Sequence, residues 1–339
     1  MQDSQDLQDL QDLQHDDTYL MARKRQGTVG MSLCLLLVVW IAIAYALGIC
    51  YSLFMPKNVI SNSLGTMLIS DISQYLVALP IAILVMRKVP IVETKQFTMK
   101  LRQFGGFFAV SIPIMYVGNF VGIALALLLT AGKAENRVSD IVASGDLWET
   151  ILFVVIIAPI MEEWLFRKQI LGRLRVYGEK RAIVFSALVF ALFHMNIFQF
   201  FYAFGLGLVF GYMYVRTSKL RYSILLHMLV NFQGSVVALW LEKQLVDASG
   251  NMIDVDKLTN QELSKMPIGF VLAGIYGMFM LAMLVIGIIL LVRRRKYLVF
   301  FNAPNELSKK DGRKSLYGSI GVIAFLIISI IMNVLMLFS

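Results

Sequence analysis

The amino-acid sequence predicts an all-α protein, a polytopic bundle of transmembrane helices. Hydrophobic residues make up 58% of the 339 residues and charged residues only 16%, which is far from the balance of a soluble globular chain. A helix needs about 20 mainly apolar residues to cross the hydrocarbon core of a bilayer, and runs of this kind recur along the whole sequence. We therefore expect a multi-pass integral membrane protein, with the plasma membrane as its location.

Eight or nine runs are candidates for membrane spans. The total depends on two short runs, 182–198 and 200–216, which are nearly continuous with each other. The nine candidate spans are 29–54, 65–86, 106–131, 149–169, 182–198, 200–216, 222–241, 268–292 and 316–338.

The distribution of Lys and Arg predicts the orientation, because positive residues are retained on the cytoplasmic side of a membrane. With a cytoplasmic N-terminus, most of the 31 Lys and Arg residues fall in cytoplasmic segments. The net charge of +9 then follows from topology and from attraction to anionic lipids, so the lipid bilayer is an expected partner and nucleic acid is not. Cys34 and Cys50 both lie in the first span, so no disulfide framework is expected.

Composition divides the chain into four regions. Residues 1–22 begin with a repeated Gln-Asp-Leu pattern, which indicates a disordered acidic cytoplasmic tail. N-terminal membrane helices follow over 23–146, then a core rich in buried polar residues over 147–241, and a loop with two further membrane helices over 242–339. Within the second region, Asp71 either lines a polar cavity or lies near the outer boundary of its span, and the boundary is favoured. An amphipathic helix is expected over 90–105.

Polar residues whose side chains can take part in catalysis are concentrated between Ile151 and Asn231. Two glutamates, two histidines, an arginine and an asparagine lie there within otherwise apolar helices. A charged side chain near the bilayer centre costs at least a few kcal/mol, so such residues indicate a functional site. The stretch is therefore the expected site of the chemistry.

The first cluster is formed by Glu162, Glu163 and Arg167. Glu163 and Arg167 are four residues apart, so they share a helix face and can form an ion pair. Glu162 points about 100° away, so the same arginine does not neutralise it. Two adjacent carboxylates in a low dielectric resist double ionisation, which favours a general base or acid. The alternative is that both glutamates only connect helices by hydrogen bonds.

The second cluster is formed by His194, His227 and Asn231. His227 and Asn231 are four residues apart and could donate hydrogen bonds to one oxygen, as in an oxyanion hole. They could instead be a structural polar pair between helices. Phe190 lies one turn before His194 and can fix the orientation of its imidazole. Glycines at 205, 207 and 211 predict a tight helix crossing beside these residues.

The ordered set Glu162-Glu163-x-x-x-Arg167, Phe190-x-x-x-His194 and His227-x-x-x-Asn231 resembles the CAAX-protease and bacteriocin-processing family of intramembrane endopeptidases. Eukaryotic members of that family remove the last three residues of prenylated proteins. The resemblance implies that Glu162 activates water together with His194. It also implies that His227 and Asn231 stabilise the oxyanion, with Glu163, Arg167 and Phe190 in support.

The role of a metal in this family is disputed. Glu162, His194 and His227 are a plausible zinc ligand set with one open position, as in a metalloprotease. Asn231 is a poor zinc ligand and suits hydrogen bonding better, so a metal-free mechanism that depends on the glutamate is preferred.

The leading functional hypothesis is an endopeptidase that cleaves membrane-embedded or lipid-associated peptides. The alternative is a non-proteolytic membrane scaffold or bacteriocin-immunity protein that binds a partner membrane protein. A proton-coupled transporter is a weaker alternative, because the sequence shows no inverted repeat. The sequence indicates neither the identity of the substrate nor the oligomeric state.

Overall fold

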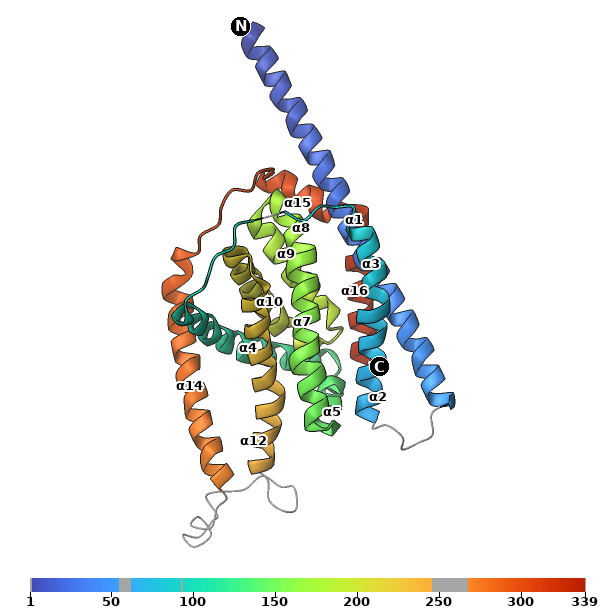
Figure 1. The fold of residues 1–339 in the computed structure, drawn as a ribbon, viewed down its shortest axis with the longest axis vertical. Coiled ribbons are helices and arrows are strands. Elements are labelled where there is room, and N and C mark those ends of the chain that lie inside the picture. The colour runs from blue at the N-terminus through green and yellow to red at the C-terminus, as the bar shows by residue number, and fades with distance from the viewer. Residues whose placement is uncertain (1, 55–61, 93, 246–267, 339) are drawn as a thin grey trace.

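The computed structural model describes residues 2–54, 62–92, 94–245 and 268–338. Every regular element in these residues is helical, which confirms the predicted class, and Figure 1 shows the helices gathered in one bundle. Most of the predicted outer loop 242–266 lies outside the described residues. The elements, with η for π- or 3₁₀-helical segments, are α1 Gln2–Phe54, α2 Asn62–Asp71, η1 Ile72–Ala78, α3 Leu79–Met86, α4 Leu101–Leu129, α5 Arg137–Ser144, α6 Leu147–Glu149, η2 Thr150–Ile157, α7 Ala158–Glu163, η3 Trp164–Leu171, α8 Gly172–Leu174, η4 Arg175–Tyr177, α9 Glu179–Phe193, α10 Ile197–Thr217, α11 Leu220–Asn231, η5 Phe232–Val237, α12 Ala238–Leu245, α14 Ile268–Arg294, η7 Arg295–Tyr297, α15 Lys309–Tyr317 and α16 Ile320–Phe338.

Seven helical segments of the described residues are long and apolar enough to cross a membrane, where the sequence predicted eight or nine. The difference lies in two places. The segment from Leu147 to Leu171 is helical throughout but carries Glu149, Glu162, Glu163 and several basic residues. The second is α9, which has only 15 residues. The seven segments are Asp16–Phe54, Asn62–Met86, Leu101–Leu129, Ile197–Thr217, Leu220–Leu245, Ile268–Tyr297 and Ile320–Phe338.

Helices α9 and α10 form a hairpin inside the bundle. A helix of 15 residues is about 22 Å long, which is shorter than the roughly 30 Å of the hydrocarbon core. The chain reverses at His194–Asn196, where Met195 has a positive φ of 47°. The Asn196 side chain then caps α10 by accepting a hydrogen bond from the Phe198 N–H at 3.0 Å. His194 is thereby placed at the inner end of the hairpin.

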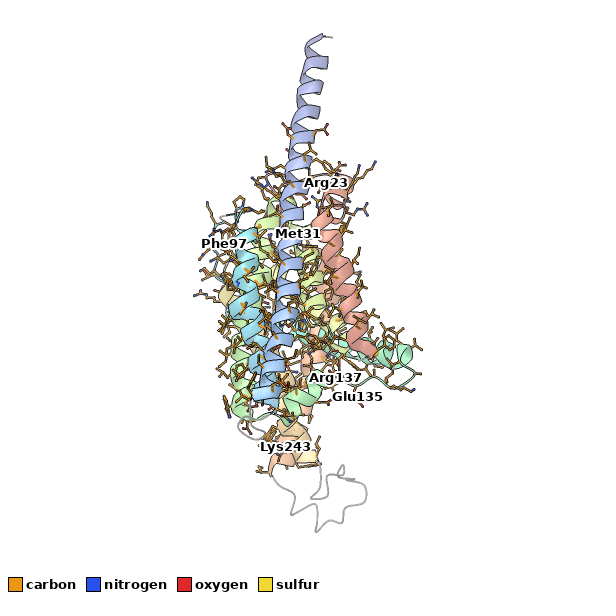
Figure 2. The ribbon with its side chains drawn as sticks, turned by 90° about the vertical axis from the view of Figure 1, so that its right-hand side faces the viewer. Arg23, Met31, Phe97, Glu135, Arg137 and Lys243 are labelled. Atoms are coloured by element: carbon orange, nitrogen blue, oxygen red, sulfur yellow. The ribbon has the colours of Figure 1, made fainter. Side chains whose placement is uncertain are left out.

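The N-terminal tail differs from its prediction. Residues 2–22, expected to be disordered, form the first part of α1, which projects beyond the bundle (Figures 1 and 2). The repeat contains mostly good helix formers and neither Gly nor Pro, so it can extend the membrane helix. From Ala22 onward α1 packs into the bundle, with Val29 and Leu33 fully buried.

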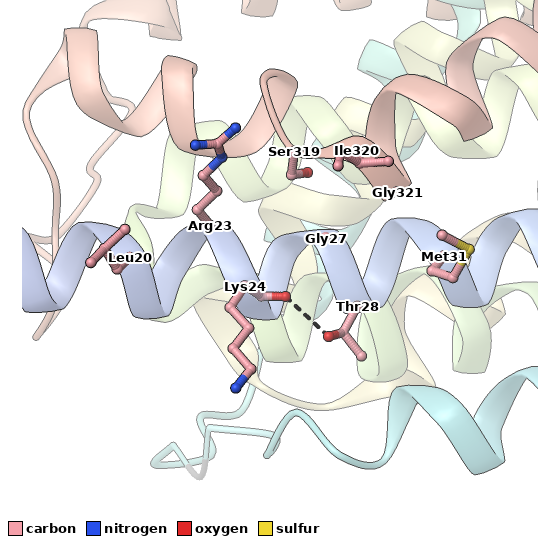
Figure 3. A pocket seen from close by; sticks show the side chains of 9 residues that line it. All are labelled: Leu20, Arg23, Lys24, Gly27, Thr28, Met31, Ser319, Ile320 and Gly321. Atoms are coloured by element: carbon pink, nitrogen blue, oxygen red, sulfur yellow. Dashed lines mark hydrogen bonds between the residues drawn. The ribbon is translucent and has the colours of Figure 1, made fainter.

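A groove of about 530 Å³ lies between α1 and α16 (Figure 3). A Cβ at Gly30 would lie 2.3 Å from the Val322 nitrogen, so the two helices cross at close range beside this groove. None of the predicted catalytic residues lines it. The lining residues are Leu20, Arg23, Lys24, Gly27, Thr28, Met31, Ser319, Ile320 and Gly321.

Residues 90–92 and 94–100, between α3 and α4, are irregular chain rather than the predicted helix. Their backbone bonds to two other elements: the Val92 N–H donates to the Gly172 carbonyl at 3.0 Å, and the Phe97 N–H donates to the Thr217 carbonyl at 2.8 Å. The amphipathic helix predicted over 90–105 is therefore wrong up to residue 100. Pro90 has no backbone N–H and disfavours helix here.

The glycines of α10 produce the predicted tight crossing. A Cβ at Gly207 would lie 2.9 Å from the Cα of Ala187 in α9, and one at Gly205 would lie 2.4 Å from Ile114 in α4. These contacts bring α4 and α9 close to the backbone of α10. The prediction of close packing by these glycines is confirmed.

Gly207→Ala is expected to lower the free energy of unfolding by about 1–3 kcal/mol, because the added methyl group must displace the α9 backbone. Thermal unfolding in detergent measures the effect. Gly274→Ala is the matched control, since a Cβ there has no neighbour within 4 Å. Equal melting temperatures for the two variants would contradict the close contact.

Candidate active site

The predicted catalytic residues come from three helical stretches that converge inside the bundle. Glu162 is the last residue but one of α7, His194 follows α9, and His227 and Asn231 lie on α11. Glu162 Oε2 lies 3.7 Å from His227 Nε2, and the Phe190 ring packs against both imidazoles, with centres 4.8 Å from His194 and 5.6 Å from His227. The structure thus brings the carboxylate and both imidazoles together. Their catalytic roles stay predictions.

Glu163 and Arg167 form the predicted ion pair. Arg167 Nε donates to Glu163 Oε2 at 3.0 Å, and both side chains are 0% exposed. The guanidinium also donates to Ser186 Oγ at 3.0 Å and lies 5.0 Å from the centre of the Phe190 ring. Such a planar, always charged group suits a buried pair of this kind. Arg167 therefore links η3 to α9.

His227 connects the two glutamates. Its Nδ1 lies 3.3 Å from Glu163 Oε1, and its Nε2 faces Glu162. Its ring stacks on Phe210, with ring centres 5.0 Å apart. A carboxylate accepts hydrogen bonds, so Glu163 favours a proton on Nδ1. Neutral His227 then presents an acceptor to Glu162, and only the imidazolium form presents a donor there.

His194 is oriented by the backbone of α9. Its Nδ1 lies 2.8 Å from the Phe190 carbonyl oxygen, which can only accept. Nδ1 therefore carries the proton, and Nε2 of the neutral ring is an acceptor. The Phe190 ring packs edge-on to the imidazole with centres 4.8 Å apart. The Phe190 ring and its carbonyl group thus both contact the imidazole, and the role of Phe190 in fixing this ring stays a prediction.

Asn231 connects α11 to η2. Its Nδ2 donates to the Val154 carbonyl oxygen at 2.9 Å. In this π-helical segment the Ala158 N–H bonds to Phe153 O, five residues earlier, so the next bond would run from residue 159 to Val154. Residue 159 is proline and has no N–H. Asn231 thus satisfies a carbonyl left free by Pro159, and its second amide hydrogen remains for another acceptor.

Asn231→Ala is expected to lower the free energy of unfolding by about 1–3 kcal/mol, because the Val154 carbonyl loses its donor in an apolar region. In a Pro159→Ala background the new N–H can bond to Val154, so the same change should cost clearly less. Melting temperatures of the wild type, both single variants and the double variant measure this coupling. Strict additivity would refute the assigned bond.

A zinc site does not fit these residues. Among the described residues, no three or more His, Cys, Asp or Glu side chains are grouped so that they could hold a metal ion. The metalloprotease expectation is therefore not supported.

Sequence reasoning missed a contact from the second span. The Tyr75 hydroxyl, on η1, donates to Glu162 Oε1 at 3.4 Å. Asp71 lies one turn earlier, near the middle of the continuous helix 62–86, and its charge interacts with that of Glu162. The boundary position favoured for Asp71 and the alternative of a polar cavity both stay predictions. The available signal was the pair of polar residues four apart in an apolar span.

Sequence comparisons find a related family in the region that contains most of these residues. The model of the family "Type II CAAX prenyl endopeptidase Rce1-like" matches residues 144–233. Residues 144–233 are thus similar to this family of CAAX endopeptidases. The family segment includes Glu162, His194, His227 and Asn231, but not Asp71 or Tyr75.

One curated relative in this family is the membrane-embedded CAAX protease MroQ of Staphylococcus aureus (strain USA300). It is 43% identical over 89 residues, which are 24% of this chain and 36% of that protein. The match thus spans about a third of the length of the relative. No solved structure matches the chain.

Proposed function

We propose that the protein is an intramembrane endopeptidase that hydrolyses peptide bonds of membrane-embedded or lipid-associated peptides. The observation that carries the proposal is the different setting of the two adjacent glutamates. Glu163 is fully buried and paired with Arg167, whereas the Glu162 side chain is 19% exposed and faces His227. One carboxylate is thus held in a structural pair, and the other is accessible for chemistry.

In the first step, the Glu162 carboxylate takes a proton from water while the water oxygen bonds to the carbonyl carbon of the peptide. The second hydrogen stays on the water oxygen and donates a hydrogen bond to His194 Nε2, which is the acceptor of the neutral ring because Nδ1 faces the Phe190 carbonyl. The apolar surroundings strengthen these interactions relative to bulk water.

In the second step, the tetrahedral intermediate carries its negative charge on the former carbonyl oxygen. The His227 imidazolium and the second amide hydrogen of Asn231 donate to this oxygen. The carbon–nitrogen bond then breaks, and the proton held by Glu162 moves to the leaving nitrogen, which gives an amine and a carboxylic acid. Glu163 and Arg167 act through His227, whose ring they hold in place.

The descriptions of related proteins support the proposed activity. The matched family is described as a CAAX prenyl endopeptidase, and the relative in Staphylococcus aureus is named a CAAX protease. The proposed location is the plasma membrane, with the site open toward the cytoplasm, as the distribution of Lys and Arg predicts.

The test is a cleavage assay with a library of internally quenched apolar peptides, incubated with the purified full chain in detergent micelles. Mass spectrometry identifies new peptide termini, and the proposal expects termini that Glu162→Gln protein does not produce. A scaffold or immunity protein would yield none. In cells that lack the chain, full complementation by Glu162→Gln would favour the scaffold.

A further inference from the structure

The second span contacts the Glu162 carboxylate through Tyr75, which lies outside the segment 144–233 that matches the family model. Tyr75 is 6% exposed, and its hydroxyl donates to Glu162 Oε1, while Glu162 Oε2 faces His227. The two oxygens of Glu162 are therefore approached from two different helices, η1 and α11. A carboxylate approached at both oxygens has its terminal torsion fixed, although that torsion is otherwise broad.

The alternative partner for Tyr75 would be Asp71, one turn away on the same helix. The structure gives the phenolic proton to Glu162, and Asp71 Oδ2 is buried without a hydrogen-bond partner among the described residues. Two neighbouring carboxylates repel each other in a low dielectric. The hydrogen bond that Tyr75 donates therefore opposes a displacement of the Glu162 carboxylate away from Asp71.

We propose that Tyr75 is a positioning residue, whose hydroxyl holds the Glu162 carboxylate with Oε2 toward His227. The inference rests on the proposed function, because it assigns Tyr75 an effect on the group that activates water. Tyr75 itself does not contact the reacting atoms. A buried tyrosine hydroxyl generally has a partner, and here the partner is the reactive carboxylate rather than a backbone group.

The first experiment does not need a substrate. The full chain in detergent is treated with dicyclohexylcarbodiimide, which modifies carboxyl groups in apolar surroundings, and mass spectrometry follows modification at Glu162. Tyr75→Phe keeps the ring and removes the donor, so Glu162 should react several-fold faster. Tyr177→Phe is the matched control, because it removes another buried hydroxyl that bonds to a charged group, Arg25, at 3.2 Å. Its labelling rate should equal that of the wild type.

The second experiment measures kcat and KM on the best-cleaved peptide of the library. Tyr75→Phe should lower kcat about tenfold, the lower part of the range for a hydrogen bond to a charged group, with KM within about twofold. Tyr177→Phe should retain wild-type kcat. A wild-type labelling rate or a wild-type kcat in Tyr75→Phe overturns the inference. If the wild type cleaves no peptide, the proposed function fails, and the labelling rate still decides the role of Tyr75.

Discussion

Replacing Glu162 by glutamine is expected to reduce peptide cleavage by at least about 1000-fold, because the amide cannot accept the proton of the attacking water. Glutamine has nearly the same shape, so the contacts of the side chain with its neighbours and the stability of the fold should change little. The side chain is 19% exposed, which avoids a large burial penalty for the amide. Initial rates on the best-cleaved peptide of the library measure the effect.

The matched control for this variant is Glu135→Gln. Glu135 is an exposed glutamate at the opposite end of the bundle from Arg23 (Figure 2). Its replacement by glutamine should leave the rate of peptide cleavage unchanged. Melting temperatures of both variants exclude unfolding as the cause of a lost rate. Undiminished cleavage by Glu162→Gln would end the assignment of Glu162 as the base.

Replacing Arg167 by methionine is expected to produce the largest loss of stability, about 3–5 kcal/mol. Arg167 and Glu163 are both 0% exposed, so removal of the cation leaves a buried carboxylate without its partner. The contacts of the guanidinium with Ser186 and Phe190 are lost as well. Thermal unfolding in detergent and the yield of monodisperse protein measure the effect.

The double variant Glu163→Leu/Arg167→Met distinguishes the charge from the packing. It removes both members of the pair, so its stability should lie well above that of Arg167→Met alone. Its activity should remain low, because His227 loses the carboxylate at its Nδ1. Lys168→Met changes the exposed neighbouring residue and should cost less than about 0.5 kcal/mol. A double variant as unstable as Arg167→Met would show that the unpaired, buried Glu163 carboxylate is not the cause of the lost stability.

Local features of the site could be predicted from the sequence. The Glu163–Arg167 pair and the arrangement of Phe190 with His194 follow from a four-residue spacing on one helix. The membrane class follows from composition. These features need no knowledge of which helices are neighbours, which is why the sequence is informative about them.

Contacts between distant helices could not be predicted in the same way. The bond between Tyr75 and Glu162 joins residues 87 positions apart, and that between Asn231 and Val154 joins residues 77 positions apart. Both depend on the packing order of the helices and on departures from regular α-helix. Asn231 was predicted as an oxyanion donor from its spacing to His227, whereas its bond to Val154 also requires the free carbonyl created by Pro159.

Four π-helical segments lie beside the residues of the site: η1 contains Tyr75, η2 precedes α7, η3 begins directly after Glu163, and η5 begins directly after Asn231. Each such segment accommodates extra backbone in a wider turn, which rotates everything beyond it relative to a regular helix. A deletion of one residue within η2 could therefore be absorbed as ordinary α-helix with the fold retained. In the regular helix, however, the Ala158 N–H would bond to the carbonyl four residues earlier, which is the one that Asn231 binds, so a chain that inserts and folds normally could still lack a working site.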